Sequence, residues 1–316
     1  TPIRRQRQMC IRDRYKIKHL MKISGAITAL ATPMKVDGSL DFLSLEKLIE
    51  FQISEGINAL VAVGTTGESA TVDVKEHLEI IDFFIKISNG RVPIIAGTGA
   101  NSTKEAIELT EEARVLGADA ALLVSPYYNK PTQEGLFQHF SEIADAVDLP
   151  QIIYNVPSRT ASNIEVDTVE KLCSNKNIIG IKDATGDLNI FEDLKRQCSF
   201  EINSGNFAIY SGDDETSFDF ISRGGHGTIS VTSNILPKLV SEMYEAAKNN
   251  SQPGDEINKK LSKINKLLFL ESNPIPVKFA LHLMGIIDKG IRLPLTWLDE
   301  KFHQDIQNEL KNLELI

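Results

Sequence analysis

The chain has 316 residues, of which 42% are hydrophobic and 24% charged, and its formal net charge is −9. This composition is typical of a globular protein with a large core, and the acidic excess argues against a nucleic-acid or anionic-membrane partner. No run approaches the ~18 uncharged apolar residues that a membrane span requires. The three cysteines, Cys10, Cys173 and Cys198, form neither a CxxC pair nor an even framework, which indicates reduced thiols in a cytosolic protein.

The first twenty residues differ from the rest of the chain. The segment TPIRRQRQMCIRDRYKIKHL is strongly basic, has no clear hydrophobic period and lacks the long apolar core of a signal peptide. Its part RQMCIRDR resembles translated sequencing-adapter read-through. We therefore expect residues 1–20 to be a non-native extension and the natural chain to start at Met21; a basic arm for nucleic acid is the alternative.

From Ser24 onward, a short apolar run recurs about every 30 residues, which is the spacing of successive strand–helix units. Most runs are continuously hydrophobic, as expected for strands that are covered on both faces. The predicted strands lie in GAITALATP (25–33), INALVAVGTT (57–66), VPIIAGTG (92–99), DAALLVSPYY (119–128), PQIIYNVP (150–157), IIGIKDATG (178–186), FAIYSGDD (207–214) and HGTISVTSN (226–234).

The segments between these runs have helical periodicity. Apolar residues recur at helical spacing in 41–56 and again in 73–90. The predicted buried stripe of the second of these helices consists of Val74, Leu78, Ile81 and Ile85. The segment 101–117 opens with Ser102-x-x-Glu105, which predicts a capping box at its first turn.

Eight such units predict a (β/α)8 TIM barrel over residues 21–234. A doubly wound open sheet is the alternative, but such a sheet rarely has eight consecutive parallel units without a glycine-rich nucleotide loop, which this sequence lacks. After the eighth unit the sequence becomes mainly helical, with breaks at Pro253–Gly254 and at NPIP (273–276). We expect residues 235–316 to form a C-terminal helical extension packed against the barrel.

The carboxyl ends of the strands are where such barrels carry their active sites, and here these ends are polar, aromatic or glycine-rich. Residues two apart in a strand share a face. In the sixth strand one face is expected to carry Ile178, Gly180 and Lys182, and the other Ile179, Ile181 and Asp183. The same parity groups Tyr154 with Ile152, and Thr65 with Val61 and Val63. Lys182, Tyr154 and Thr65 are therefore expected to converge at the mouth of the barrel.

Lys182 is the most informative of these residues. An apolar barrel wall lowers the pKa of a lysine and so leaves more of the neutral amine that attacks a carbonyl. The alternative is a structural ion pair with Asp183, but Asp183 is expected to point outward, and an inward lysine without a carboxylate would be costly. Tyr154 could pass protons if a partner orients it, although most strand tyrosines only fill the core.

The loops beyond the strands offer two sites for anions. Arg159 follows the fifth strand and has the planar fork that suits a carboxylate, with a surface salt bridge as the alternative. The sequence GTTGES (64–69) supplies backbone amides at a strand-to-helix turn, which suits a small anion. Glu68 in this sequence has a simpler explanation as an acid at a helix N-terminus, favoured by the helix dipole.

Seven motifs occur in register: GTTGESAT, AGTGAN, PYYNKP, YNVPSRT, GIKDATG, SGDD and GGHGTISV. Together they closely resemble the dihydrodipicolinate synthase family, and the resemblance runs from about Ser24 to IRLP (291–294). It implies a lyase that condenses pyruvate with L-aspartate-4-semialdehyde on the diaminopimelate route to lysine. It further implies a cytoplasmic homotetramer, arranged as a dimer of dimers, that needs no metal or other cofactor.

The resemblance also implies roles for individual residues. Lys182 would form a Schiff base with pyruvate. Thr65, Tyr154 and Tyr128 would form a proton relay, with Tyr128 reaching into the active site of a neighbouring subunit. The iminium is an electron sink that lets the methyl group of pyruvate lose a proton, and hydroxyl groups can relay protons without adding charge.

Substrate contacts are implied at four further positions. The backbone amides of Thr65 and Thr66 would hold the pyruvate carboxylate, and Arg159 would bind the carboxylate of the semialdehyde. The backbone of Gly212 and of Ile229 would line the pocket. In feedback-sensitive relatives L-lysine binds at the subunit interface. The matching positions here are Ser69, Ala70, His77, Asn101, Glu105 and Tyr127, whereas Val74 stands where a histidine often lies.

Two other functions are compatible with parts of the sequence. A sister pyruvate-dependent aldolase such as N-acetylneuraminate lyase would also use a barrel lysine, but Arg159 suits a short semialdehyde acid better than a sugar chain. A non-catalytic metabolite-binding homologue would be expected to lack Lys182 or Tyr154, and both are present. The six histidines are scattered, so no metal site is predicted, and His226 in GGHG is interpreted as structural.

Overall fold

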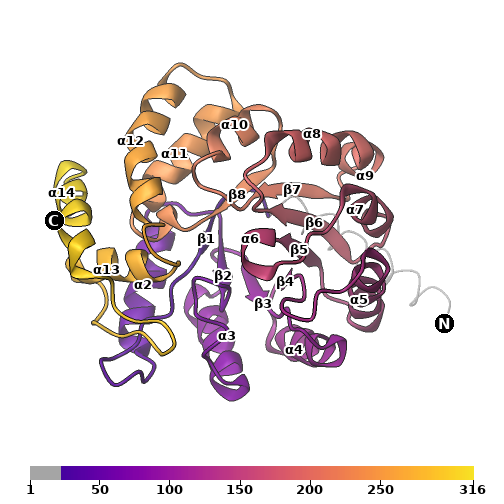
Figure 1. Ribbon diagram of the computed structural model, residues 1–316, viewed down its shortest axis with the longest axis horizontal. Helices are drawn as coiled ribbons and strands as arrows, with labels where there is room; N and C mark the ends of the chain where they lie inside the picture. The colour runs from indigo at the N-terminus through magenta and orange to yellow at the C-terminus, as the bar shows by residue number, and fades with distance from the viewer. Residues whose placement is uncertain (1–22) are drawn as a thin grey trace.

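In the computed structural model, which describes residues 23–316, eight parallel strands close into a barrel in sequence order (Figure 1). The strands are β1 (Gly25–Ala29), β2 (Ala59–Ala62), β3 (Ile94–Gly97), β4 (Ala120–Val124), β5 (Gln151–Asn155), β6 (Ile178–Asp183), β7 (Ala208–Ser211) and β8 (Gly227–Ser230). Each lies within one of the eight predicted runs. The predicted (β/α)8 TIM barrel is therefore confirmed, while the interpretation of residues 1–20 lies outside the described residues.

Helices surround the barrel and continue beyond it (Figure 1). Those between the strands are α2 (Phe42–Ser54), α3 (Val74–Ser88), α4 (Thr103–Leu116), α5 (Gln133–Ala146), α6 (Pro157–Thr160), α7 (Val166–Cys173), α8 (Leu188–Gln197), α9 (Ser199–Asn203) and α10 (Ser217–Ser222). After β8 come η1 (Thr232–Asn234), α11 (Pro237–Lys248), α12 (Pro253–Leu267), α13 (Ile275–Leu283), η2 (Glu300–Phe302) and α14 (His303–Asn312). None of the helices from residue 23 onward is long and apolar enough to cross a membrane.

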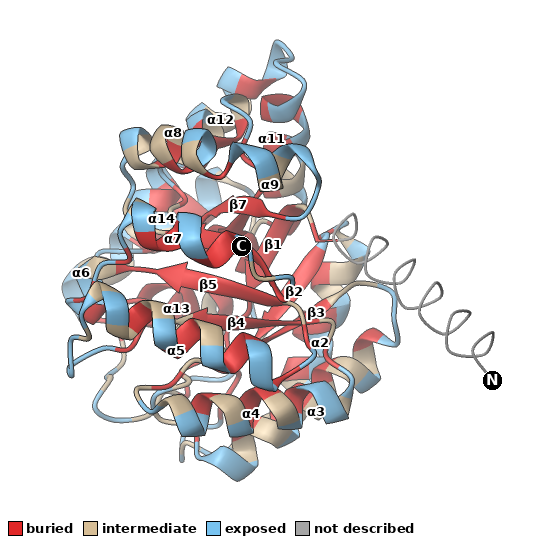
Figure 2. Ribbon diagram, turned by 90° about the vertical axis from the view of Figure 1, so that its right-hand side faces the viewer, coloured by how far each residue is buried: buried red, intermediate tan, exposed pale blue. Residues whose placement is uncertain are grey.

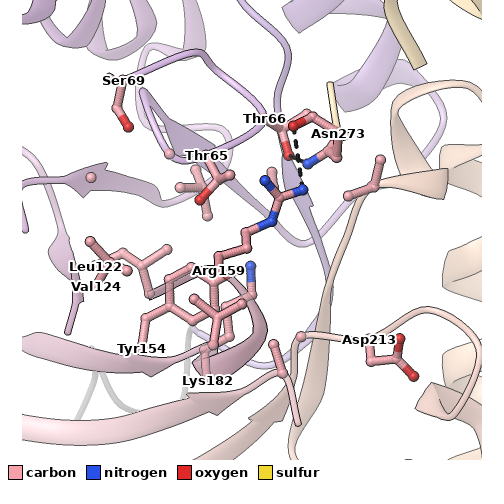
Figure 3. A pocket seen from close by; sticks show the side chains of 18 of the residues that line it. Thr65, Thr66, Ser69, Leu122, Val124, Tyr154, Arg159, Lys182, Asp213 and Asn273 are labelled. Carbon is pink, nitrogen blue, oxygen red and sulfur yellow. Dashed lines mark hydrogen bonds between the residues drawn. The ribbon is translucent and has the colours of Figure 1, made fainter. Parts of the chain in front are cut away.

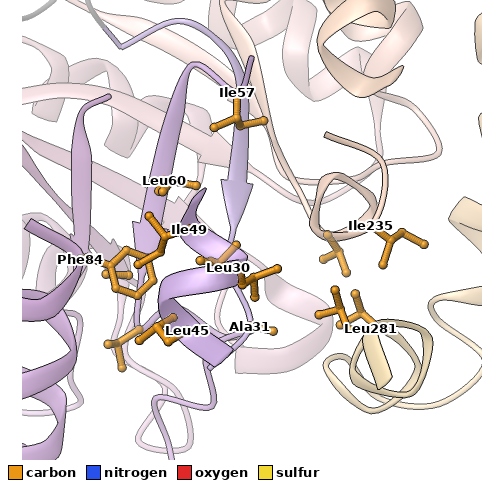
Figure 4. Close-up of a cluster of buried hydrophobic side chains, with 14 of the residues drawn as sticks. Leu30, Ala31, Leu45, Ile49, Ile57, Leu60, Phe84, Ile235 and Leu281 are labelled. Carbon is orange, nitrogen blue, oxygen red and sulfur yellow. The ribbon is translucent and has the colours of Figure 1, made fainter. Parts of the chain in front are cut away.

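The core has an inner and an outer layer. Figure 2 shows buried strands at the centre and helices that are buried on the side toward the barrel. Inside the barrel, Ile27, Val61, Ile95 and Ile152 pack with Tyr154. Outside it, β1, β2, α2, α3 and α13 enclose a cluster that includes Leu30, Ile49, Phe84, Ile235 and Leu281 (Figure 4). Full burial of one such side chain contributes about 1.5–3 kcal/mol, so these layers stabilise the barrel.

Helix α3 buries a different stripe from the one predicted. His77, Ile80, Ile81 and Phe84 are buried, whereas Val74 is 55% exposed. Of the four predicted residues only Ile81 is among the buried ones, and the polar His77 was not in the predicted stripe. The structure buries this ring because its Nε2 lies 2.7 Å from the carbonyl oxygen of Gly97, which satisfies the polar atom.

The complete capping box also lies on α3 and not on α4. The carboxylate of Asp73 accepts from Glu76 N at 2.9 Å, and Asp73 N donates back to the Glu76 carboxylate at 3.4 Å. On α4, Glu105 N donates to the hydroxyl of Ser102 at 3.5 Å, without a return contact within the described chain. Glu105 is exposed, so its carboxylate faces solvent.

Strand β6 contains a bulge at its start. The register with β5 shifts there, and Ile152 pairs with Gly180. Because a bulge adds one residue to a strand, Ile179 packs in the inner cluster and Ile178 in the outer one, the reverse of the prediction. Beyond the bulge the predicted parity holds, and Lys182 pairs with Tyr154 at the mouth of the barrel.

The barrel closes where β8 returns to β1. These strands pair from Gly25 with Gly227 to Thr28 with Ser230. Just beyond the paired residues, the side-chain amide of Asn234 donates to the carbonyl oxygen of Ala29 at 2.8 Å, and its oxygen accepts from Ala31 N at 2.9 Å. One buried side chain thus continues the hydrogen bonding of the two strands past the end of the sheet.

Candidate active site

A cavity of about 520 Å³ opens at the carboxyl ends of the strands (Figure 3). Its walls come from the strand ends, the turn after β2, helix α6 and the segment 269–273 that precedes α13. The residues that the sequence predicted for the catalytic and substrate-binding site and that line this cavity are Thr65, Thr66, Tyr154, Arg159, Lys182 and Gly212. Ser69, which was matched to the effector site, also lines it. The strand ends and the segments that follow them therefore bring a lysine, a phenol, a hydroxyl and a guanidinium into one cavity.

Lys182 is buried, with 5% of its surface exposed. Burial lowers the pKa of its amine to about 7; the nearby Asp214 carboxylate acts against this effect, and the Arg159 cation adds to it. Its Nζ lies 4.2 Å from the centroid of the Tyr154 ring. Asp183 points outward and accepts from the Thr185 hydroxyl at 2.7 Å, so the ion pair considered for Lys182 is not formed. A substantial fraction of this amine is neutral near pH 7.

Asp214 was missed in the sequence, although it is the last residue of the motif SGDD. Its buried carboxylate accepts from Val231 N at 2.9 Å and from Thr232 N at 3.0 Å. Burial raises the pKa of this carboxyl group, while these backbone hydrogen bonds act in the opposite direction. Asp214 is the carboxylate that raises the pKa of Lys182. It therefore limits how far burial can neutralise the amine.

Gly212 provides the room that Lys182 occupies. A Cβ atom at this position would lie 2.8 Å from Cε of Lys182 and 2.7 Å from Cβ of Ala184. Such distances are too short for non-bonded carbon atoms, so a larger residue would displace the lysine side chain. Ile229 belongs to the inner barrel cluster, and Val231, two residues further along, lines the cavity.

Tyr154 lies beside Lys182 in the cavity wall. Burial raises the pKa of its phenol, while the Arg159 cation and a side-chain hydrogen bond with Thr65 act in the opposite direction. The predicted meeting of Thr65 and Tyr154 is therefore present, but strand parity is not its cause. Strand β2 ends at Ala62, and the backbone of Val63 then turns into the left-handed region at φ 53°.

The turn from Val63 to Glu68 is strained. Both residues have a positive φ, 53° and 57°, which costs a residue other than glycine about 1–3 kcal/mol. The turn packs so closely that a Cβ on Gly97 would lie 2.3 Å from the carbonyl oxygen of Val63. The hydroxyl of Thr32 donates to the carbonyl oxygen of Gly67 at 2.8 Å. Neighbouring elements therefore hold the turn in this conformation.

Glu68 does not belong to a helix N-terminus, contrary to the prediction. Helix α3 starts at Val74, and the carboxylate of Glu68 instead accepts from Nζ of Lys278 on α13 at 2.8 Å. Both side chains are fully buried. Burial lowers the pKa of Lys278 and the Glu68 charge raises it. Breaking such a pair by removing one partner typically costs about 3–5 kcal/mol.

Asn273 makes a second contact with the same turn. Its side-chain amide donates to the hydroxyl of Thr66 at 2.9 Å, and its carbonyl oxygen accepts from the Arg159 guanidinium at 3.4 Å (Figure 3). From the sequence, NPIP (273–276) was predicted to be a break between helices, without a role in the site. Its role in the site depends on contacts across more than a hundred residues, which no local pattern reveals.

Arg159 is exposed at the mouth of the cavity on the short helix α6. From residue 23 to the C-terminus no carboxylate forms an ion pair with it, so the surface salt bridge that was the alternative is not formed. Its contact with Asn273 leaves a cation at the entrance. This arrangement suits a substrate that carries a carboxylate.

The tyrosines of the loop after β4 point away from the cavity of their own chain. Tyr128 is 92% exposed and has a positive φ of 71°, and Tyr127 is 41% exposed. Tyr127 N donates to the side-chain oxygen of Asn101 at 2.9 Å. Tyr128 is therefore exposed and is not among the residues that line the cavity of its own chain.

The other positions matched to an effector site differ in their surroundings. Ser69 lines the cavity, while Ala70 and Glu105 are exposed. His77 is buried, its ring is bound to Gly97, and burial lowers its pKa. His226 is structural as predicted, because its Nδ1 accepts from Ile209 N at 3.1 Å. Over the described range, no three His, Cys, Asp or Glu side chains converge as a metal site would require.

Comparison with known proteins agrees with this geometry. The sequence profile of the dihydrodipicolinate synthetase family matches residues 22–313. The 4-hydroxy-tetrahydrodipicolinate synthase of Pseudomonas savastanoi pv. phaseolicola is 55% identical over 290 residues, which are 92% of this chain and 98% of that protein.

Solved structures give the same result. The chloride-inhibited dihydrodipicolinate synthase of Acinetobacter baumannii, complexed with pyruvate, superposes with a TM-score of 0.90 at 53% identity, covering 93% of this chain and 100% of that one. The enzyme of Cyanidioschyzon merolae with lysine bound has a TM-score of 0.88 at 36% identity, covering 93% and 99%. The chain belongs to the dihydrodipicolinate synthetase family.

Proposed function

We propose that this protein is a 4-hydroxy-tetrahydrodipicolinate synthase that condenses pyruvate with L-aspartate-4-semialdehyde through a Schiff base on Lys182. The observation that carries the proposal is the buried amine of Lys182, whose pKa is lowered to about 7 at the centre of the cavity. Support for the first substrate comes from the pyruvate complex of the Acinetobacter relative.

The chemistry follows from the residues around Lys182. Its neutral amine adds to the carbonyl carbon of pyruvate, and loss of water gives an iminium. The iminium withdraws electrons, so the methyl group can lose a proton and become an enamine that attacks the aldehyde carbon of the second substrate. Tyr154 lies beside the amine and Thr65 beside Tyr154, and in this proposal their hydroxyl groups carry protons during these steps.

Two positive sites hold the two carboxylates. The backbone amides of the turn at Thr65 and Thr66 hold the pyruvate carboxylate beside Lys182. Arg159 at the entrance binds the carboxylate of the semialdehyde, which orients its aldehyde toward the enamine. The backbone of Gly212 completes the wall beside Lys182.

Assembly completes the relay in this proposal. The exposed Tyr128 enters the cavity of a neighbouring subunit and extends the relay of Thr65 and Tyr154 there. The functional unit is then at least a dimer, and we propose a homotetramer built from two such dimers. Cys173 and Cys198 are free thiols, which supports a cytoplasmic location.

L-lysine is the proposed inhibitor. The lysine complex of the Cyanidioschyzon relative supports a site near Ser69, Ala70, His77, Asn101, Glu105 and Tyr127. The exposed carboxylate of Glu105 is suited to the ammonium of the effector. Val74 stands where a histidine often lies, so one polar contact with L-lysine is lost, and the ring of His77 is already bound to Gly97. We therefore expect L-lysine to inhibit only weakly.

Reductive trapping tests the proposed function. The protein is incubated with pyruvate and borohydride, and the modified peptide is identified by mass spectrometry. One adduct on the peptide that contains Lys182, lost in Lys182→Ala, is expected. An adduct on another lysine would refute the assignment. Turnover of aspartate semialdehyde but not of N-acetylmannosamine then separates the synthase from the sister aldolase.

A further inference from the structure

We infer that the buried ion pair between Glu68 and Lys278 positions the turn that holds the pyruvate carboxylate. The inference rests on the proposed function, because that function assigns the amides of Thr65 and Thr66 to pyruvate. It adds a role for two residues that lie outside the reacting groups. Both act through the turn and are therefore positioning residues.

The turn needs an external anchor at its far end. Val63 and Glu68 mark its two ends, and both have left-handed backbones that residues other than glycine seldom adopt. Val63 is held by its close packing against Gly97. At the other end Glu68 N donates to the carbonyl oxygen of Thr65 at 3.1 Å within the turn, and the Glu68 carboxylate is held by Lys278. The first bond shapes the turn, and the contact with Lys278 fixes this end of it against α13.

Helix α13 makes its contacts with alternate residues of the turn. Lys278, in its first turns, binds Glu68, and Asn273, just before the helix, binds Thr66 at 2.9 Å. The backbone N–H of Lys278 donates to the carbonyl oxygen of Pro274 at 3.0 Å, which fixes the spacing of the two contacts. A rigid helix end therefore determines where the amide of Thr66 lies.

Stability alone does not account for this pair. Replacing a buried ion pair by well-packed residues of similar volume is often neutral or stabilising. One oxygen of Glu68 is buried and has no hydrogen-bond partner among residues 23–316, which is a further cost. A hydrogen-bonded ion pair has a defined direction and distance, which apolar packing lacks. Here the contact between Lys278 and Glu68 fixes the backbone position of the turn from Val63 to Glu68.

The double variant Glu68→Gln/Lys278→Met separates positioning from stability, because it removes both charges together. The control is Lys263→Met/Glu309→Gln, which removes a pair of the same residue types between α12 and α14, outside the cavity. Its Nζ and carboxylate lie 2.6 Å apart, with the carboxylate buried and the lysine exposed. For each protein we would measure the thermal midpoint, the pyruvate concentration for half-maximal borohydride trapping, and kcat.

In the Glu68→Gln/Lys278→Met variant, the half-saturating pyruvate concentration is expected to rise about tenfold, comparable to weakening one hydrogen bond to a charged group. The value of kcat is expected to stay within about threefold, because Lys182 and Tyr154 line the cavity whereas Glu68 and Lys278 are not among its lining residues. The control is expected to keep its pyruvate affinity. A folded double variant with unchanged pyruvate affinity would overturn the inference.

If the double variant does not fold, Glu68→Asp decides. It keeps the charge and shortens the side chain by one methylene, so weaker pyruvate binding in a folded protein supports positioning and unchanged binding refutes it. Absence of any adduct in the unmutated protein would instead refute the proposed function. The two failures are therefore distinguishable.

Discussion

The rate of Schiff-base formation should follow the titration of Lys182. Burial lowers the pKa of this amine from 10.5 to about 7. At pH 7 about half of the amine is then neutral, against roughly one part in 3,000 for an unperturbed lysine. Burial thus increases the nucleophilic fraction by about a thousandfold at neutral pH.

Trapping with cyanoborohydride at low pyruvate concentration measures this fraction. The initial rate of adduct formation should rise with pH, with a midpoint near 7, and level off above it. The variant Asp214→Asn should move the midpoint to lower pH, because the carboxylate that stabilises the ammonium is lost while the Asn oxygen can still accept from Val231 N and Thr232 N. Asp213→Asn is the control, since that carboxylate is bound to Thr216.

The reasoning fails if the midpoint lies near 10, because the cavity would then not neutralise the amine. It also fails if Asp214→Asn raises the midpoint, because the sign of the charge effect would be wrong. Equal shifts in Asp214→Asn and Asp213→Asn would show that the effect is not specific to the carboxylate beside Lys182.

Three further predictions concern the second substrate, assembly and regulation. Arg159→Ala should raise KM for aspartate semialdehyde roughly ten- to a hundredfold, because a charge-assisted contact is worth about 1.5–3 kcal/mol, and should change KM for pyruvate far less. Equal increases for both substrates would contradict this assignment. Mixing inactive Tyr128→Phe with inactive Lys182→Ala subunits should restore some activity, because a mixed dimer contains one intact site; no recovery after verified subunit exchange would mean that Tyr128 does not act in a neighbour. Titration with L-lysine at fixed substrate concentrations should show inhibition that is weaker in Glu105→Ala, and identical curves for the two proteins would place the effector elsewhere.

Much of the fold could be predicted because each strand is buried on both faces. Such strands appear in the sequence as short, continuous apolar runs, and the amphipathic helices between them separate one run from the next. The inward position of Lys182 followed from strand parity, since the two residues before it and the residue after it are regular. Local periodicity was sufficient wherever the local backbone is regular.

The predictions were wrong where a backbone irregularity or a contact with a distant residue determines the position of a side chain. The bulge in β6 exchanged the faces of Ile178 and Ile179, and the left-handed Val63 brought Thr65 to the site by a turn. Glu68 was misread because its partner, Lys278, lies 210 residues away. Pairings of this range leave no periodic pattern in one sequence.

The closure of the barrel between β1 and β8, which the side chain of Asn234 extends, has a consequence for how the chain is made. The amide and carbonyl groups of β1 that face β8 belong to the strand of the barrel that is synthesised before the other seven, and their partners are about two hundred residues later in the chain. Until those residues leave the ribosome, β1 presents an open edge of the kind that recruits strands from other chains. Nascent or truncated chains that stop before β8 should therefore be the species that associate with one another or with chaperones, and the full-length chain should lose this tendency once the ring has closed.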